Sequence, residues 1–270
     1  MYTVSAHIND LTVVPVPLDL TPRAGFPLRP DAINEALSVD PDIKIVYICS
    51  PGNPTGALVN PEHVKAVLDH PTWNGVVVVD EAYVDFAADG SSLAPWVTGY
   101  PNLAVMQTLS KAFGLAGIRL GAAFVSTEVA RLLNNLKAPY SISSPTSILA
   151  STALKPEGLA VMRKHVSAIL AQRQRLLEEL PKIPGIGRFL GGTDANFLLV
   201  EILDAPNGNP DNGPALKLYE ELAETKGVVV RFRGKEAGCN GCLRISVGTE
   251  TENTRLLERM RECLASIHAA

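Results

Sequence analysis

The sequence lacks several features that define specialised classes of protein. No apolar run approaches the roughly 20 residues needed to cross a bilayer, and the N-terminus has no basic segment followed by an apolar one, as a secretory signal would. The net charge of -4 includes no basic excess, which argues against nucleic-acid binding. We therefore expect a soluble, cytoplasmic protein with no membrane or nucleic-acid partner.

Cysteine is also scarce, with four in 270 residues, too few for a disulfide scaffold. Cys239 and Cys242 form a C-x-x-C, but a zinc site needs two more ligands at compatible spacing, and the histidines form no H-x-x-x-H pair. A redox pair is expected at the start of a helix, whereas this pair runs into the strand-like CLRISV. The sequence thus predicts no metal site, with metal or redox chemistry as an alternative.

The first half of the chain alternates between apolar β-branched runs and helical periodicity. A helix is expected over residues 61–69, with Asn60 as its N-cap and proline at its first position. Strands are expected over residues 43–48, 76–80, 103–108 and 120–125. Buried strands that alternate with helices predict an α/β fold with a mostly parallel sheet, whose active-site residues lie where strands end.

The second half changes character. Residues 156–180 form one long amphipathic pattern, typical of a helix that connects two domains. Strands are then expected over residues 196–201, 228–231 and 243–247, alternating with helices over 213–226 and 251–268. We therefore predict a large domain over residues 1–155, a connecting helix over 156–180 and a small α+β domain over 181–270.

The segment from Thr108 to Gly121, TLSKAFGLAGIRLG, places Lys111 directly after a predicted strand. A lysine that presents its amine to an aldehyde beside a phosphate needs such neighbours. The amine forms a Schiff base, while Ser110 and Arg119 can donate hydrogen bonds to phosphate oxygens. The alternative is a buried loop lysine paired with a carboxylate.

Further polar residues accompany other strands. Asn53 lies in S-P-G-N-P-T-G, where prolines and glycines fix a turn, although such a turn can be purely structural. Asp80 ends VVVVD, where a bare buried carboxylate would cost several kcal/mol; it is therefore functional, or else a helix cap or ion pair. Tyr83 can equally be a packed aromatic. Arg244, inside a strand, can fork onto a carboxylate or phosphate.

Together these segments resemble the fold type I aminotransferases that use pyridoxal 5'-phosphate, and among them the histidinol-phosphate branch. Arg231 and Arg244, thirteen residues apart, and DEAYVDF favour that branch. The segments that carry the resemblance are YICSPGNPTG, VVVDEAYVDF, TLSKAFGLAGIRLG, DANFLLV and VVVRFRG followed by GCLRISVGT. The resemblance implies the PLP-transferase fold type I, with a mostly parallel large domain and a smaller C-terminal α+β domain.

The resemblance also implies a transaminase that converts histidinol phosphate and 2-oxoglutarate to imidazole-acetol phosphate and glutamate, as a homodimer. Lys111 would carry the cofactor and move protons, and Asp80 would pair with the pyridine nitrogen. The implied catalytic residues are Lys111, Asp80 and Tyr83. The implied cofactor-binding residues are Asn53, Asp80, Tyr83, Ser110, Lys111 and Arg119. The implied substrate-binding residues are Arg231, Arg244 and Asn53.

The resemblance is incomplete at the front of the chain. Family members carry a substantial segment before the equivalent of MYTVSAHIND, with a phosphate-binding turn and an aromatic residue that stacks on the cofactor. Tyr2 lies a few residues too late for that role. We therefore expect the isolated chain to bind the cofactor weakly or to fold poorly. The alternatives are an aromatic aminotransferase, a related phosphate-substrate decarboxylase, or a truncated non-catalytic homologue.

Overall fold

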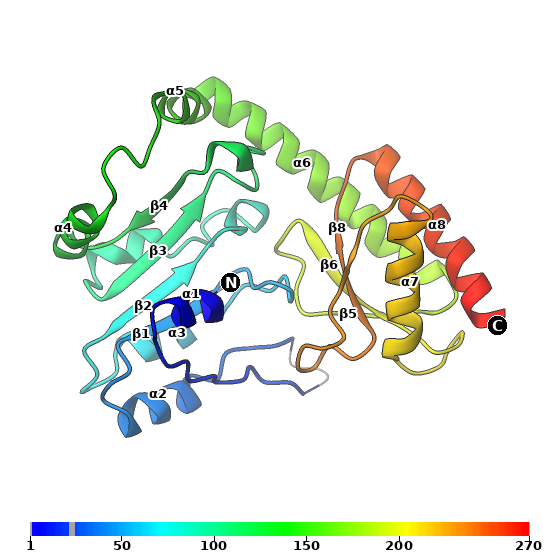
Figure 1. Cartoon of the computed structure of the whole chain (residues 1–270), viewed down its shortest axis with the longest axis horizontal. Coiled ribbons are helices and arrows are strands. Elements are labelled where there is room, and N and C mark those ends of the chain that lie inside the picture. Colours follow the sequence, from blue (N-terminus) through cyan, green and yellow to red (C-terminus); the bar gives the residue numbers. More distant parts are fainter. Residues whose placement is uncertain (1, 22–24, 270) are drawn as a thin grey trace.

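The first half of the chain forms a four-stranded sheet in the computed structural model, which describes residues 2–21 and 25–269 (Figure 1). The strand order is β1-β2-β3-β4. The strands are β1 (Ile45–Cys49), β2 (Val76–Asp80), β3 (Leu103–Thr108) and β4 (Gly121–Phe124). The pairs β1–β2 and β2–β3 are parallel, whereas β4 runs antiparallel to β3 at the edge. The predicted mostly parallel sheet is confirmed.

Two helices, α2 (Pro30–Val39) and α3 (Pro61–Leu68), pack against this sheet. The predicted helix over residues 61–69 is α3, and Asn60 Oδ1 accepts a 3.0 Å hydrogen bond from Glu62 N, as an N-cap does. Apolar residues of α2 and α3, such as Ile33 and Val64, share a core with Val77 of β2. The helices of this half are α1 (Tyr2–Ile8), α2 (Pro30–Val39), α3 (Pro61–Leu68), α4 (Thr127–Leu136) and α5 (Ser144–Ala153). Single 3-10 turns lie at Val84–Phe86, Ala94–Thr98 and Ala116–Ile118.

The second half forms an antiparallel sheet in the order β5-β6-β8-β7. Its strands are β5 (Ile186–Leu190), β6 (Phe197–Ile202), β7 (Arg231–Phe232) and β8 (Cys242–Ser246). The helices α7 (Asn212–Glu224) and α8 (Glu250–Ala269) lie against it (Figure 1). Leu218 of α7 and Met260 of α8 are fully buried in one core with Leu243 of β8. The predicted α+β character of this half is confirmed.

In this half one predicted strand differs in detail, and one strand was not predicted. The strand expected over residues 228–231 begins only at Arg231, because Gly227 turns with φ +64° and Val228 N then bonds to Leu222 O at the end of α7. Residues 228–230 therefore lie in the connection that follows α7, and pairing with β8 starts only at Arg231. Strand β5 was missed, because its register shifts between Ile186 and Phe189, which breaks the period of two that marks a strand.

The helix α6 (Pro156–Glu179) connects the two sheets, as Figure 1 shows. Val166 packs with Phe86 beside the first sheet, and Leu176 belongs to the core of the second. A short 3-10 turn, Leu180–Lys182, follows it. Between those positions, Arg173 donates to Phe86 O at 3.4 Å and to Ala195 O at 2.8 Å. One helix thus holds both halves, although the boundaries of the predicted domains stay a prediction.

Candidate active site

The predicted site residues gather at the carboxyl ends of the parallel strands. Cys49 and Asp80 are partners in the β1–β2 register, and Ser50 N donates to Asp80 O at 2.9 Å. The turn that contains Asn53 therefore begins beside Asp80. Lys111 follows the end of β3 by three residues. Because parallel strands end at the same edge of a sheet, three distant segments meet there, as the sequence predicted.

Asp80 is a half-buried carboxylate near one positive charge. Burial raises the pKa of Asp80; the hydrogen bond from Ala82 N, 2.9 Å long, and the charge of Lys111 lower it by less. Lys111 Nζ lies 5.2 Å from the centroid of the Tyr83 ring, and in the described part of the chain this amine forms no ion pair. Neither the carboxylate nor the amine forms an ion pair among the described residues, which fits a ring with a protonated nitrogen and an aldehyde.

Phe197 connects this group to Arg244, which is predicted to bind the substrate. Its ring meets the ring of Tyr83 edge to face, with centroids 5.1 Å apart, and Arg244 Cζ lies 4.9 Å from its centroid. Phe197 is only 1% exposed, so this contact fixes both neighbours. The sequence placed Phe197 in a strand and gave it no role, because a buried aromatic in an apolar run has the same pattern as any core residue.

Arg244 is a half-buried cation with spare donor capacity. Its Nη1 donates a 2.7 Å hydrogen bond to Asn53 Oδ1, while its Nε is buried without a partner in the described residues. Burial, followed by the charges of Arg233 and Arg231, lowers the pKa of Arg244. A buried donor without a partner is costly, so the arrangement fits an anion that binds beside Asn53.

The turn that carries Asn53 is held by the loop between β5 and β6. Gly192 N donates to Thr55 O at 2.9 Å, and Asp194 N donates to Gly56 O at 2.8 Å. A Cβ on Gly191, whose φ is +75°, would lie 2.0 Å from Thr55 O. Only glycine therefore permits this approach. No pattern in the sequence signalled this contact, because its two segments are far apart in the chain.

The side chains of three predicted residues form no hydrogen bond with this group among the described residues. Ser110 Oγ lies 2.9 Å from Thr108 Oγ1. Arg119 is exposed, has a left-handed backbone and donates to Ala116 O at 2.9 Å. Arg231 is exposed too, although it is the register partner of Arg244. Hydroxyls and a guanidinium are groups that can donate to a phosphate, but the roles of Ser110 and Arg119 in cofactor binding stay predictions.

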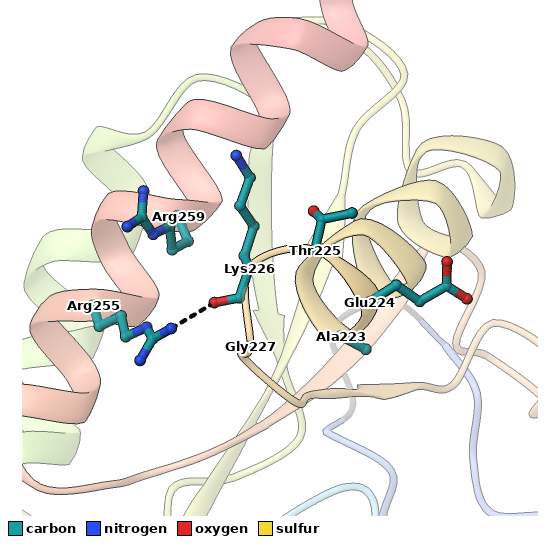
Figure 2. Close-up of a pocket in the computed structure, with 7 residues that line it drawn as sticks. All are labelled: Ala223, Glu224, Thr225, Lys226, Gly227, Arg255 and Arg259. Atoms are coloured by element: carbon teal, nitrogen blue, oxygen red, sulfur yellow. Dashed lines mark hydrogen bonds between the residues drawn. The ribbon is translucent and has the colours of Figure 1, made fainter.

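A surface hollow beside the end of α7 lies elsewhere in the molecule (Figure 2). It contains none of the predicted site residues, and its cations already have protein partners. Arg255 Nη2 donates to Lys226 O at 2.9 Å, and Arg259 pairs with Glu262 at 2.8 Å. We therefore place the site at the strand ends and not in this hollow.

The structure also tests the C-x-x-C motif. Cys239 and Cys242 are buried free thiols, and a hydrogen bond with Cys239, followed by burial, raises the pKa of Cys242. Across residues 2–21 and 25–269, no three His, Cys, Asp or Glu side chains gather as metal ligands would. Within the same ranges, no helix has both the length and the apolar character needed to span a bilayer.

Comparison with known proteins agrees with this geometry. The family described as aminotransferase class I and II matches residues 1–260, and the chain belongs to that family. It is similar to the histidinol-phosphate aminotransferase of Schizosaccharomyces pombe, with 53% identity over 97% of this chain and 67% of the relative. The Saccharomyces cerevisiae enzyme of the same name is 49% identical over 98% of this chain and 66% of the relative. The chain thus spans about two thirds of the length of these relatives.

Solved structures give the same fold. The histidinol-phosphate aminotransferase from Clostridium acetobutylicum superposes with a TM-score of 0.84 at 25% identity, over 98% of this chain and 75% of that one. The enzyme of the same name from Sinorhizobium meliloti, in complex with pyridoxal-5'-phosphate, has a TM-score of 0.84 at 23% identity, over 98% and 68%. The predicted fold type I architecture is confirmed.

Proposed function

We propose that this chain is a pyridoxal 5'-phosphate-dependent transaminase that acts on histidinol phosphate and 2-oxoglutarate, and yields imidazole-acetol phosphate and glutamate for histidine biosynthesis. One observation carries the proposal. The Lys111, Asp80 and Tyr83 group lies one aromatic ring away from Arg244, which is bonded to Asn53. A reactive amine and an anion-binding arginine are thus held in one continuous cluster. Relatives named for this activity support the choice of substrate.

The residues present fit this cofactor. When bound, pyridoxal 5'-phosphate supplies an electron-withdrawing ring that stabilises negative charge on the substrate carbon. Asp80 would hold the ring nitrogen, because a carboxylate whose pKa is raised by burial gains most from a nearby cation. Asn53 and Tyr83 would donate to the phenolic oxygen, and Ser110 with Arg119 would hold the phosphate.

The chain's own side chains would then bind the substrate and move its proton. Lys111 Nζ would accept a proton from the substrate carbon and return it, as a general acid–base group does. Arg244 would hold the anionic end of the substrate. Its planar guanidinium can donate two hydrogen bonds to a phosphate or to a carboxylate, so one residue can serve both half-reactions. Arg231 lies beside it as its register partner.

We also propose that the chain acts in the cytoplasm as a homodimer. Large apolar side chains are exposed around α4 and α5, with Leu136 at 83%, Ile148 at 67% and Leu132 at 58%. Such a concentration on one region suits a surface that a second copy covers. Light scattering after size exclusion tests this proposal, and a monomer at micromolar concentration would contradict it.

Borohydride trapping and a substrate comparison test the proposed function. The chain would be incubated with pyridoxal 5'-phosphate and reduced, and the labelled peptide would be mapped by mass spectrometry. With the cofactor in saturating excess, which offsets the expected weak binding, we expect stoichiometric label at Lys111. Amino transfer to 2-oxoglutarate is then compared between histidinol phosphate and L-phenylalanine, and we expect histidinol phosphate to be preferred. Preference for phenylalanine would favour an aromatic aminotransferase, and no label on a folded chain would favour a non-catalytic homologue.

A further inference from the structure

Three arginines share one face of the second sheet. Arg231 and Arg244 are register partners in β7 and β8. Side chains alternate along a strand, so Arg233 lies on the same face as Arg231, while Phe232 between them packs into the core on the other. Arg233 N donates to Cys242 O at 2.8 Å, which continues the ladder. The pairing thus adds a third guanidinium to the pair already assigned to the substrate.

Arg233 lies opposite Cys242, two residues from Arg244 along β8, and the protein does not use all of its hydrogen-bond donors. Its Nη1 donates to Glu236 Oε1 at 2.7 Å, and its side chain is 26% exposed. Its Nε is buried without a hydrogen-bond partner among the described residues. Arg244 has an unpartnered buried Nε as well. Two neighbouring guanidiniums that each keep an unused donor are typical of an anion-binding site, whereas an arginine that only stabilises a loop would use its donors on the protein.

The loop that carries Arg233 is fixed by the start of α7. Asn212 Nδ2 donates to Gly234 O at 3.0 Å, and Asn212 Oδ1 accepts from Gly241 N at 2.8 Å. A Cβ on Gly234 would lie 1.9 Å from that Oδ1, so the close approach requires glycine. The backbone that carries Arg233 is therefore already ordered, so that binding a ligand costs little conformational entropy there.

The charges of this face match a phosphate ester better than a carboxylate. The three guanidiniums, less the carboxylate of Glu236, leave a net charge of about two, and a phosphate monoester carries about -1.5 to -2 at pH 7. A carboxylate carries one negative charge and gains less from each added cation. We infer that Arg233 is a specificity-determining residue that favours a phosphate-bearing substrate, with Glu236 restraining its charge. This inference rests on the proposed function, which places the substrate anion at Arg244.

A ligand comparison tests the inference without requiring turnover. The 270-residue chain, freed of cofactor, is titrated calorimetrically with histidinol phosphate and with histidinol, and the ratio of their dissociation constants is the readout. We expect R233Q to reduce the preference for the phosphate about tenfold, or about 1.4 kcal/mol. R233K should keep most of the preference, and E236Q should leave it unchanged or increase it. R255Q, on the exposed face of α8, should not change it.

A merely structural ion pair predicts a different pattern. R233Q and E236Q would then weaken both ligands alike, and the ratio would stay constant, which would overturn the inference. The transamination assay separates the two proposals. If the wild type transaminates histidinol phosphate and R233Q keeps the full phosphate preference, only this inference fails. If the wild type neither transaminates nor prefers the phosphate, both fail.

Discussion

Arg244 Nη1 and Asn53 Oδ1 are joined by a 2.7 Å hydrogen bond across 191 positions of the sequence. The bond connects the turn after β1 to the middle of β8, and so connects the two sheets inside the candidate site. An arginine so held needs little reorganisation to meet an anion, because its side chain is already ordered by Asn53 and by the ring of Phe197.

Replacing this arginine should weaken both half-reactions. We expect R244Q to lower kcat/KM for histidinol phosphate and for 2-oxoglutarate about 10- to 100-fold, since a hydrogen bond to a charged group contributes about 1.5–3 kcal/mol. R244K should recover part of the loss. Steady-state kinetics with each substrate varied in turn measure this, with R259Q on α8 as the matched control. A loss confined to one substrate would show that Arg244 serves only one anion.

Lys111 should be required for activity and dispensable for folding. K111A should reduce transamination at least about 10³-fold, within the range for removal of an acid–base group, and should abolish borohydride labelling. The fold should persist, because the amine forms no ion pair in the described residues. K137A, just after α4, should label and turn over like the wild type. Label that survives in K111A would assign the cofactor to another lysine.

Ionisation of Asp80 should lower the free energy of unfolding of the cofactor-free protein as the pH rises. Its folded pKa is raised above the ordinary 3.8 by burial, so the folded state holds this proton more tightly than the unfolded state. Stability is therefore lost as the pH rises from 3.8 through the folded pKa, and stays lower above it. The D80N variant lacks this titration.

Urea denaturation of the wild type and D80N between pH 3.5 and pH 7, values chosen as roughly bracketing carboxyl titration, should show the difference. The free energy of unfolding of D80N minus that of the wild type should increase with pH and then level off. Activity should fall in the same variant, because a neutral amide does not supply the negative charge that keeps a ring nitrogen protonated. A difference that decreases with pH would mean that Asp80 is stabilised by a cation in the free protein.

Replacing Gly191 should destabilise the protein by more than the cost of its positive φ alone, because Gly191 also lies against the turn that carries Asn53. G191A and G90A both place alanine at positive φ, +75° and +83°, and each should cost about 1–2 kcal/mol for that reason. Only G191A also brings a Cβ to 2.0 Å from Thr55 O, whereas Gly90 has open space. G191A should therefore lose about 1–3 kcal/mol more and lower kcat/KM. Equal losses of stability and of kcat/KM in G191A and G90A would contradict a role for Gly191 in holding the Asn53 turn.

The sequence predicted the parts of the site that depend on local pattern. The bounds of β2 and β3 agree with the apolar runs, and Asp80 and Lys111 follow from where those runs end. The sequence did not predict the role of Phe197, the contact of Gly191 with the Asn53 turn, or the face on which Arg233 lies. Each depends on contacts between segments far apart in the chain, and such contacts leave no periodic signal in either segment.

The bond between Asn53 and Arg244 can form only late in synthesis, because Arg244 lies in β8 near the end of the chain. Domains generally fold as the chain emerges, N-terminal part first, and the first sheet could form with Asp80 and Lys111 in place before β8 has been translated. The anion receptor could not, because its guanidiniums lie in β7 and β8. A nascent chain without β8 would therefore lack Arg244, the residue proposed to hold the anionic end of the substrate.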